Sequence, residues 1–166
     1  MTTSLDESSP RYQALLQLLR TADTIWNASH AFFARWDLSP SQFNVLNLLH
    51  LTPEGVSQSE LGRQLIMHRS NVTGLVDRLE KRGWVERHDV AEDRRAYRVV
   101  LTPKGQQLLK EILPHYYAGA ELVWGELPAE RIAQITSGLL QVAQNAERVA
   151  AQEARRSNSQ PAKQSQ

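Results

Sequence analysis

The sequence contains no cysteine among its 166 residues. This absence excludes disulfide bonds, thiolate metal ligands, thiol redox sensing and cysteine nucleophiles. No apolar run approaches the roughly 20 residues that a membrane-spanning helix requires. The segment Met1–Pro10 is polar and acidic, without the basic and apolar regions of a signal peptide. We therefore expect a cytoplasmic protein with no membrane partner.

The chain also lacks the short motifs that mark common enzyme classes. It has no phosphate-binding glycine loop, no Gly-x-Ser-x-Gly nucleophile elbow and no His-Glu-x-x-His motif. We expect neither catalysis nor a bound cofactor. The formal net charge of +1 says little about partners until it is divided by region.

Helical periodicity and helix-start signals dominate the pattern that is present. Apolar residues recur at helical spacing from about residue 11 to 35 and again after Pro128. Helices are predicted to start at Ser39 and Ser57, since each serine can cap a helix and has a glutamine or glutamate three residues later. Another helix is expected over residues 69–82, and a further one from Thr102 to about Gly125, kinked by Pro114.

Two segments have strand character instead. Trp84–His88 and Tyr97–Leu101 flank the charged segment Asp89–Ala96, which predicts a hairpin with a long exposed tip. Three helices followed by a hairpin are the plan of a winged helix–turn–helix, although a plain helical bundle is the alternative.

We therefore expect a mainly α fold with a small β-hairpin wing. Residues 39–102 form the winged helix–turn–helix domain in this interpretation, and helices over 10–36 and 103–155 form a dimerisation region. Disordered ends are expected at 1–9 and 156–166. The terminal helices carry more apolar surface than a small winged core can cover, which favours a homodimer.

The second helix of such a motif places its N-terminal residues in the major groove of DNA. That surface presents short polar side chains around one arginine, and a solvated first turn is the alternative interpretation. Arg78 and Arg82 are candidates for phosphate contacts, although Arg78 also has acidic neighbours with which it can pair. The residues expected in the groove are His68, Arg69, Ser70, Asn71, Thr73 and Gly74.

The predicted hairpin tip is the second candidate DNA contact. Arg94 or Arg95 can reach the negative potential of the minor groove, and Asp93 can hold a guanidinium in position. A solvated charged turn is the alternative. Ten Lys/Arg and seven Asp/Glu lie between Ser57 and Gly105, which leaves +3 on this segment and −2 on the rest. The excess of positive charge lies where phosphate contacts are expected.

The ordered motifs resemble the MarR family of bacterial regulators. They are LGRQL at 61–65, SNVTGLVDRLEKRGWVER at 70–87, DRRA at 93–96 and VLTPKG at 100–105. The resemblance implies a homodimer with interlocking terminal helices, bound to a pseudo-palindromic operator in double-stranded DNA. It also implies that Asp93 and Arg95 form the family's wing pair, and that repression is the commoner mode of action.

His68 departs from the family, which often has serine before the recognition helix. Histidine is a weaker cap than serine, so we expect it to contact DNA instead. Because histidine titrates near neutral pH, DNA affinity should then fall above about pH 7. An identical pH response of the wild type and His68→Ala would contradict this hypothesis.

The resemblance further implies release from DNA by small aromatic or phenolic anions, bound between the dimer core and the winged domain. The expected pocket residues are Trp26, His30, Phe33, Trp36 and His50, with ordinary packing as the alternative. Arg20 or Arg35 is a candidate partner for the anion.

Two alternative functions also follow from the sequence. His30, His50 and His115 could bind zinc from three helices. A winged helix used only for protein interaction would not bind DNA in a salt-dependent way.

Overall fold

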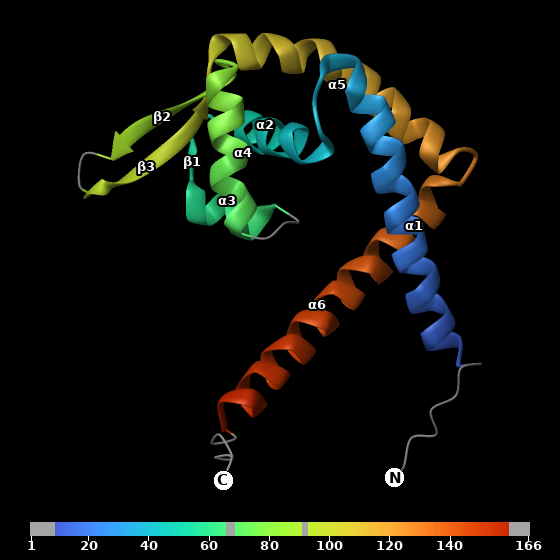
Figure 1. Ribbon diagram of the computed structural model, residues 1–166. Helices are drawn as coiled ribbons and strands as arrows, with labels where there is room; N and C mark the ends of the chain where they lie inside the picture. Colours follow the sequence, from blue (N-terminus) through green and yellow to red (C-terminus); the bar gives the residue numbers. More distant parts are fainter. Residues whose placement is uncertain (1–8, 66–68, 91–92, 160–166) are drawn as a thin grey trace. The chain divides into compact units, whose positions relative to one another are not determined.

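The computed structural model describes residues 9–65, 69–90 and 93–159 (Figure 1). It divides into two compact units between Leu113 and Pro114, inside one continuous helix. No helix within the described ranges is both long enough and apolar enough to cross a membrane. The elements in chain order are α1 (Pro10–Phe33), η1 (Ala34–Trp36), α2 (Pro40–Leu51), β1 (Val56–Ser57), α3 (Gln58–Gln64), α4 (Arg69–Lys81), β2 (Val85–Val90), β3 (Asp93–Leu101), α5 (Pro103–Trp124) and α6 (Ala129–Ser159).

This order confirms the predicted mainly α fold with a hairpin wing. We call the segment from α2 to β3 (residues 40–101) the winged unit. In Figure 1, β2 and β3 extend together as a hairpin from the region of α4, while β1 is a short arrow beside them. Helices α3 and α4 form the helix–turn–helix.

The predicted caps form at both helix starts of the winged unit. The Ser39 hydroxyl accepts from the Gln42 amide at 3.2 Å, and the Gln42 side chain accepts from the Ser39 amide at 2.8 Å. The Ser57 hydroxyl accepts from the Glu60 amide at 3.2 Å. These bonds satisfy backbone donors that have no partner inside the helix.

The helix ends also follow the sequence signals, with one exception. Gly83, two residues after the end of α4, has φ +70°, and Gly125, directly after α5, has φ +58°. Glycine adopts this left-handed conformation without a Cβ clash, so it ends a helix readily. The exception is α6, which continues through Ser159. Residues 156–159 are therefore helical, although their polar composition predicted the start of a disordered tail.

One apolar core holds the winged unit together and extends to neighbouring helices. Phe33 from α1 is 2% exposed and stacks on Phe43 from α2, with ring centroids 4.3 Å apart. The other large side chains that are almost fully buried come from α2, α3, α4, the sheet and the first half of α5. They are Val45, Leu46, Leu49, Leu61, Val72, Val76, Leu79, Val85, Val99, Leu109 and Ile112.

The sheet has three antiparallel strands in the order β1-β3-β2. The sequence did not predict β1, because a strand of two residues is too short to show alternation. The predicted long tip is also wrong. Pairing continues from Asp89↔Tyr97 to Val90↔Asp93 across a register shift, so residues 93–96 belong to β3. Alternation reports which side chains are buried, and backbone pairing continues beyond the buried part of a hairpin.

Candidate nucleic-acid interface

Helix α4 carries most of the residues predicted to read DNA. Arg69, Ser70 and Asn71 form its first turn, whereas His68 lies outside the described residues. Thr73 is exposed and Gly74 is half-buried, while Val72 and Val76 face the core. The described part of the helix therefore has an apolar face toward the core and, at Thr73 and Gly74, a more exposed side.

At Gly74 no side chain projects from the polar face of α4. Among the described residues, a Cβ atom built on Gly74 would meet only the Arg78 Nη1 atom within 4 Å, at 3.5 Å, which is an ordinary contact. A backbone without a side chain here allows a phosphate or a base edge to approach α4 closely.

Gln58 is a residue of this surface that the sequence analysis missed. It is the first residue of α3, and its side-chain amide donates to the Thr73 hydroxyl on α4. The bond connects the two helices of the helix–turn–helix at their exposed side. Its signal in the sequence was weak, because polar residues are common in the first turn of any helix.

Arg87 on β2 was also missed. Its guanidinium pairs with Asp77 through one nitrogen and with Glu80 through another, both on α4. Its charge also lies 5.1 Å from the centre of the Tyr97 ring on β3. Burial lowers the pKa of Arg87, but its contacts with Asp77 and Tyr97 and the charge of Glu80 outweigh burial and raise that pKa overall. The arginine is therefore permanently charged.

These pairs bear on the two roles considered for Arg78. Since Arg87 engages both neighbouring acids, Arg78 forms no ion pair with any other residue in the described ranges. Its side chain is exposed on α4. The arrangement suits a phosphate contact and gives no support to pairing with Asp77 or Glu80.

Arg82 has a different environment from Arg78. Its guanidinium donates to the Asp37 carbonyl at 2.5 Å, pairs with the Asp37 carboxylate at 3.0 Å and lies 3.7 Å from the centre of the Trp84 ring. These contacts fasten the end of α4 to the segment before α2, so Arg82 is a structural residue here.

The predicted wing residues Asp93, Arg94 and Arg95 all lie on β3. They therefore belong to a strand of the hairpin, and residues 91–92 lie outside the described residues. Their DNA contacts stay a prediction.

The five residues predicted for a ligand pocket have different environments. Phe33 is a core residue, and the Trp36 ring nitrogen donates to the Glu111 carboxylate at 2.7 Å. Trp26 and His30 form an edge-to-face pair on α1 with centroids 5.6 Å apart. His50 on α2 is exposed.

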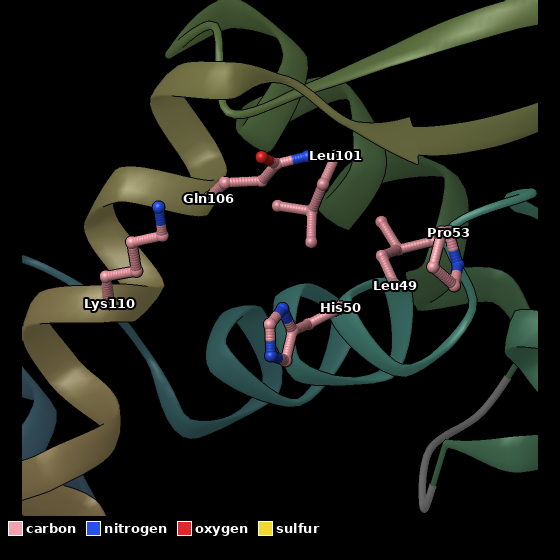
Figure 2. Close-up of a pocket in the computed structure, with 6 residues that line it drawn as sticks. All are labelled: Leu49, His50, Pro53, Leu101, Gln106 and Lys110. Atoms are coloured by element: carbon pink, nitrogen blue, oxygen red, sulfur yellow. The ribbon is translucent and has the colours of Figure 1, made fainter.

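Of these five, His50 lines a cavity of about 270 Å³ between the end of α2 and the start of α5 (Figure 2). One wall is apolar, and the other carries an imidazole, an amide and an ammonium group. The lining residues are Leu49, His50, Pro53, Leu101, Gln106 and Lys110. In the described part of the chain, no three His, Asp or Glu side chains gather as a metal site requires.

Residues 36–96, which include most of the winged unit, match the sequence profile of the MarR family. The transcriptional repressor MprA from Escherichia coli is 39% identical over 88 residues, which span 51% of this chain and 50% of MprA. The chain thus covers about half the length of that relative. The regulator PapX from Escherichia coli is 30% identical over 122 residues, 72% of this chain and 74% of PapX.

Solved structures share the fold. Sco3205 from Streptomyces coelicolor, a MarR family regulator solved in complex with DNA, superposes with a TM-score of 0.74 at 23% identity. The alignment covers 82% of this chain and 88% of Sco3205. A MarR/EmrR family regulator from Acinetobacter gives 0.75 at 18% identity, over 84% and 99% of the two chains. Given a matched helix–turn–helix and wing, and a relative covered over most of its length, this chain belongs to the MarR family of winged helix–turn–helix transcriptional regulators.

Proposed function

We propose that the protein is a homodimeric, sequence-specific DNA-binding repressor that a small aromatic or phenolic anion releases from its operator. The observation that carries the DNA-binding part is the polar face of α4. It combines an exposed Thr73, a glycine that leaves room for the backbone of DNA, and an Arg78 whose acidic neighbours are paired elsewhere. The sequences of the regulators MprA and PapX support the same assignment.

Fluorescence anisotropy with a labelled duplex from the region upstream of the protein's own coding sequence tests DNA binding. Affinity should fall steeply between about 50 and 200 mM salt, because phosphate contacts release counterions. Arg78→Ala should weaken binding to all sequences and reduce the salt slope by about 1. Thr73→Ala should mainly reduce the preference for the operator over an unrelated duplex, by roughly tenfold.

Arg131→Ala is the matched control, since it removes one exposed charge from α6, outside the winged unit. It should leave the affinity within about twofold of the wild type. Arg95→Ala tests the wing, and we expect weaker DNA binding by an intact dimer. Salt-independent binding by the wild type would contradict the DNA-binding role and favour a protein-interaction module.

The homodimer is supported by apolar side chains that the single chain leaves exposed. On α1, Leu15 and Leu19 are 49% and 59% exposed, and on α6, Leu140 and Val149 are 60% and 58% exposed. Apolar area of this kind is costly in water and is the usual content of an obligate interface.

Light scattering at micromolar concentration should give twice the chain mass. Leu140→Glu should raise the dimer dissociation constant by at least 100-fold, because burying an unpaired charge is costly. The neighbouring Gln141→Glu serves as control on the same exposed helix. A wild type that scatters as a monomer would overturn the homodimer.

The cavity between α2 and α5 supports the effector part of the proposal. A volume of about 270 Å³ suits a single substituted ring. The apolar wall of Leu49 and Leu101 can pack against the ring, and Lys110 with His50 can bind a carboxylate or phenolate (Figure 2).

Calorimetric titration with benzoate, salicylate and neutral benzamide tests this assignment. The anions should bind and release DNA, and benzamide should not. Lys110→Met should weaken anion binding by roughly tenfold, while Arg131→Ala should not. Equal binding of benzamide and benzoate would remove the charged side of the cavity from the mechanism.

A further inference from the structure

The recognition helix carries two carboxylates on the side expected to face DNA. Asp77 follows Thr73 by four residues and Gly74 by three, so it lies on the same helix face. Glu80 follows one turn later. The two side chains are 48% and 38% exposed. DNA carries one negative charge per about 1.7 Å of its axis, so carboxylates at this surface would oppose binding.

Both acids meet the same guanidinium. Arg87 Nη2 pairs with Asp77 Oδ1, and Arg87 Nη1 pairs with Glu80 Oε2. The arginine side chain is 22% exposed, and the Tyr97 ring supports it from β3. A residue of the hairpin thus places a positive charge beside the two acids of α4. The planar guanidinium group of arginine can bind two carboxylates at once.

We propose that Arg87 acts as a positioning residue that masks Asp77 and Glu80 and so permits α4 to approach DNA. The inference rests on the proposed DNA-binding function and adds a determinant of its affinity. Arg87 acts here through the two acids rather than through a base or a phosphate. The competing role is mechanical, in which Arg87 only fastens the hairpin to α4.

Substitution of the acids separates these roles. Arg87→Met should weaken binding to the labelled upstream duplex by roughly tenfold for each winged unit, because two carboxylates lose their counter-charge. Adding Asp77→Asn and Glu80→Gln to Arg87→Met should bring the affinity back to within about threefold of the wild type, since no acid is left to mask. A mechanical role predicts no recovery, because the triple variant still lacks the link between hairpin and helix.

Arg98→Met is the matched control. Arg98 lies on β3 and donates to the backbone carbonyls of Glu54 and Gly55, so its removal costs the same charge without uncovering an acid. We expect its effect to be at most about threefold. An equal loss in Arg87→Met and Arg98→Met would overturn masking, since net charge alone would then explain both.

Arg87→Lys gives a second measurement if Arg87→Met does not fold, as judged by circular dichroism. One ammonium group cannot pair with both carboxylates in the same way, so binding should fall by an intermediate factor that Glu80→Gln restores. A wild type that shows no salt-dependent DNA binding would overturn the proposed function and this inference together. Wild-type binding with an unrecovered triple variant would overturn the masking alone.

Discussion

Gly105 lies at the start of α5, where the helix passes the base of the hairpin. It is buried, and a Cβ atom at this position would lie 2.1 Å from the Trp84 carbonyl oxygen and 2.6 Å from Leu101 Cδ2. The Trp84 carbonyl accepts from the Thr102 amide at 3.1 Å, so it cannot shift without losing that bond. We expect Gly105→Ala to destabilise the protein substantially.

The magnitude follows from opposing contributions. Overpacking against backbone costs about 3 kcal/mol, near the upper end of the usual range. Loss of the Thr102 bond adds about 1 kcal/mol. Replacing glycine by alanine in a helix returns up to about 1 kcal/mol. The free energy of unfolding should therefore fall by about 3 kcal/mol, and Tm by roughly 6 to 12 °C.

Gly74→Ala is the matched control, because it adds the same methyl group to a helix of the same unit. Its nearest neighbour would be Arg78 Nη1 at an ordinary 3.5 Å. Stability should stay constant or rise by up to about 1 kcal/mol, while DNA affinity falls because the methyl group occupies the surface that approaches DNA. Urea denaturation and anisotropy measure the two properties. Equal stability of Gly105→Ala and the wild type would refute the packing argument.

Two further predictions concern the winged unit. Ser39→Ala removes the capping box with Gln42 at α2 and should lower the free energy of unfolding, measured by urea denaturation, by about 1 kcal/mol. The folded variant should bind DNA as tightly as the wild type. The hydrogen bond from Gln64, helped by Arg63 and opposed by burial, lowers the pKa of Glu60 below 4.5. A carboxylate with a lowered pKa stabilises the fold above pH 4.5 and loses this contribution as pH falls. The loss of stability between about pH 5 and 3 should therefore be smaller in Gln64→Leu than in the wild type, and parallel acid titrations of the two would contradict this cause.

Local signals predicted most of the fold. Capping serines, the glycine after α4 and the helical periodicity each act within a few residues, so the sequence determined where α2, α3 and α4 start or end. The extent of the hairpin was not predictable in this way. Backbone pairing at Val90↔Asp93 depends on the register with the partner strand, which side-chain alternation does not report.

The candidate site was predicted in part for the same reason. Thr73 and Gly74 could be assigned from their positions on one helix. The pairing of Arg87 with Asp77 and Glu80 joins a strand to a helix ten and seven residues away. The turn at Gly83 must bring the strand and the helix together before the pairing can form. Several other basic residues nearby in the sequence were equally possible partners for the same acids. Gln58 was missed because its partner Thr73 lies on another helix.

Asp37 provides a test of how the end of α4 is held. It has φ +52°, a left-handed conformation that costs most residues about 1 kcal/mol but that aspartate, like asparagine and glycine, adopts more readily. Its carboxylate pairs with Arg82 but is 93% exposed, and such surface pairs contribute little. Its backbone carbonyl also accepts from Arg82, and any residue retains that bond. We therefore expect the effect of a substitution at residue 37 on the free energy of unfolding to depend mainly on how readily the new residue adopts this backbone conformation.

Asp37→Gly and Asp37→Ala both remove the carboxylate, but only glycine adopts the left-handed conformation without strain. The free energy of unfolding of Asp37→Gly should lie within about 0.5 kcal/mol of the wild-type value, whereas that of Asp37→Ala should be lower by about 1 kcal/mol. Urea denaturation at low and high salt separates the two effects, since an ion pair weakens with salt and backbone strain does not. If both variants lose the same free energy of unfolding and the loss vanishes at high salt, the conformation of residue 37 is not the cause. The carboxylate would then be what holds Arg82, and with it the end of the recognition helix.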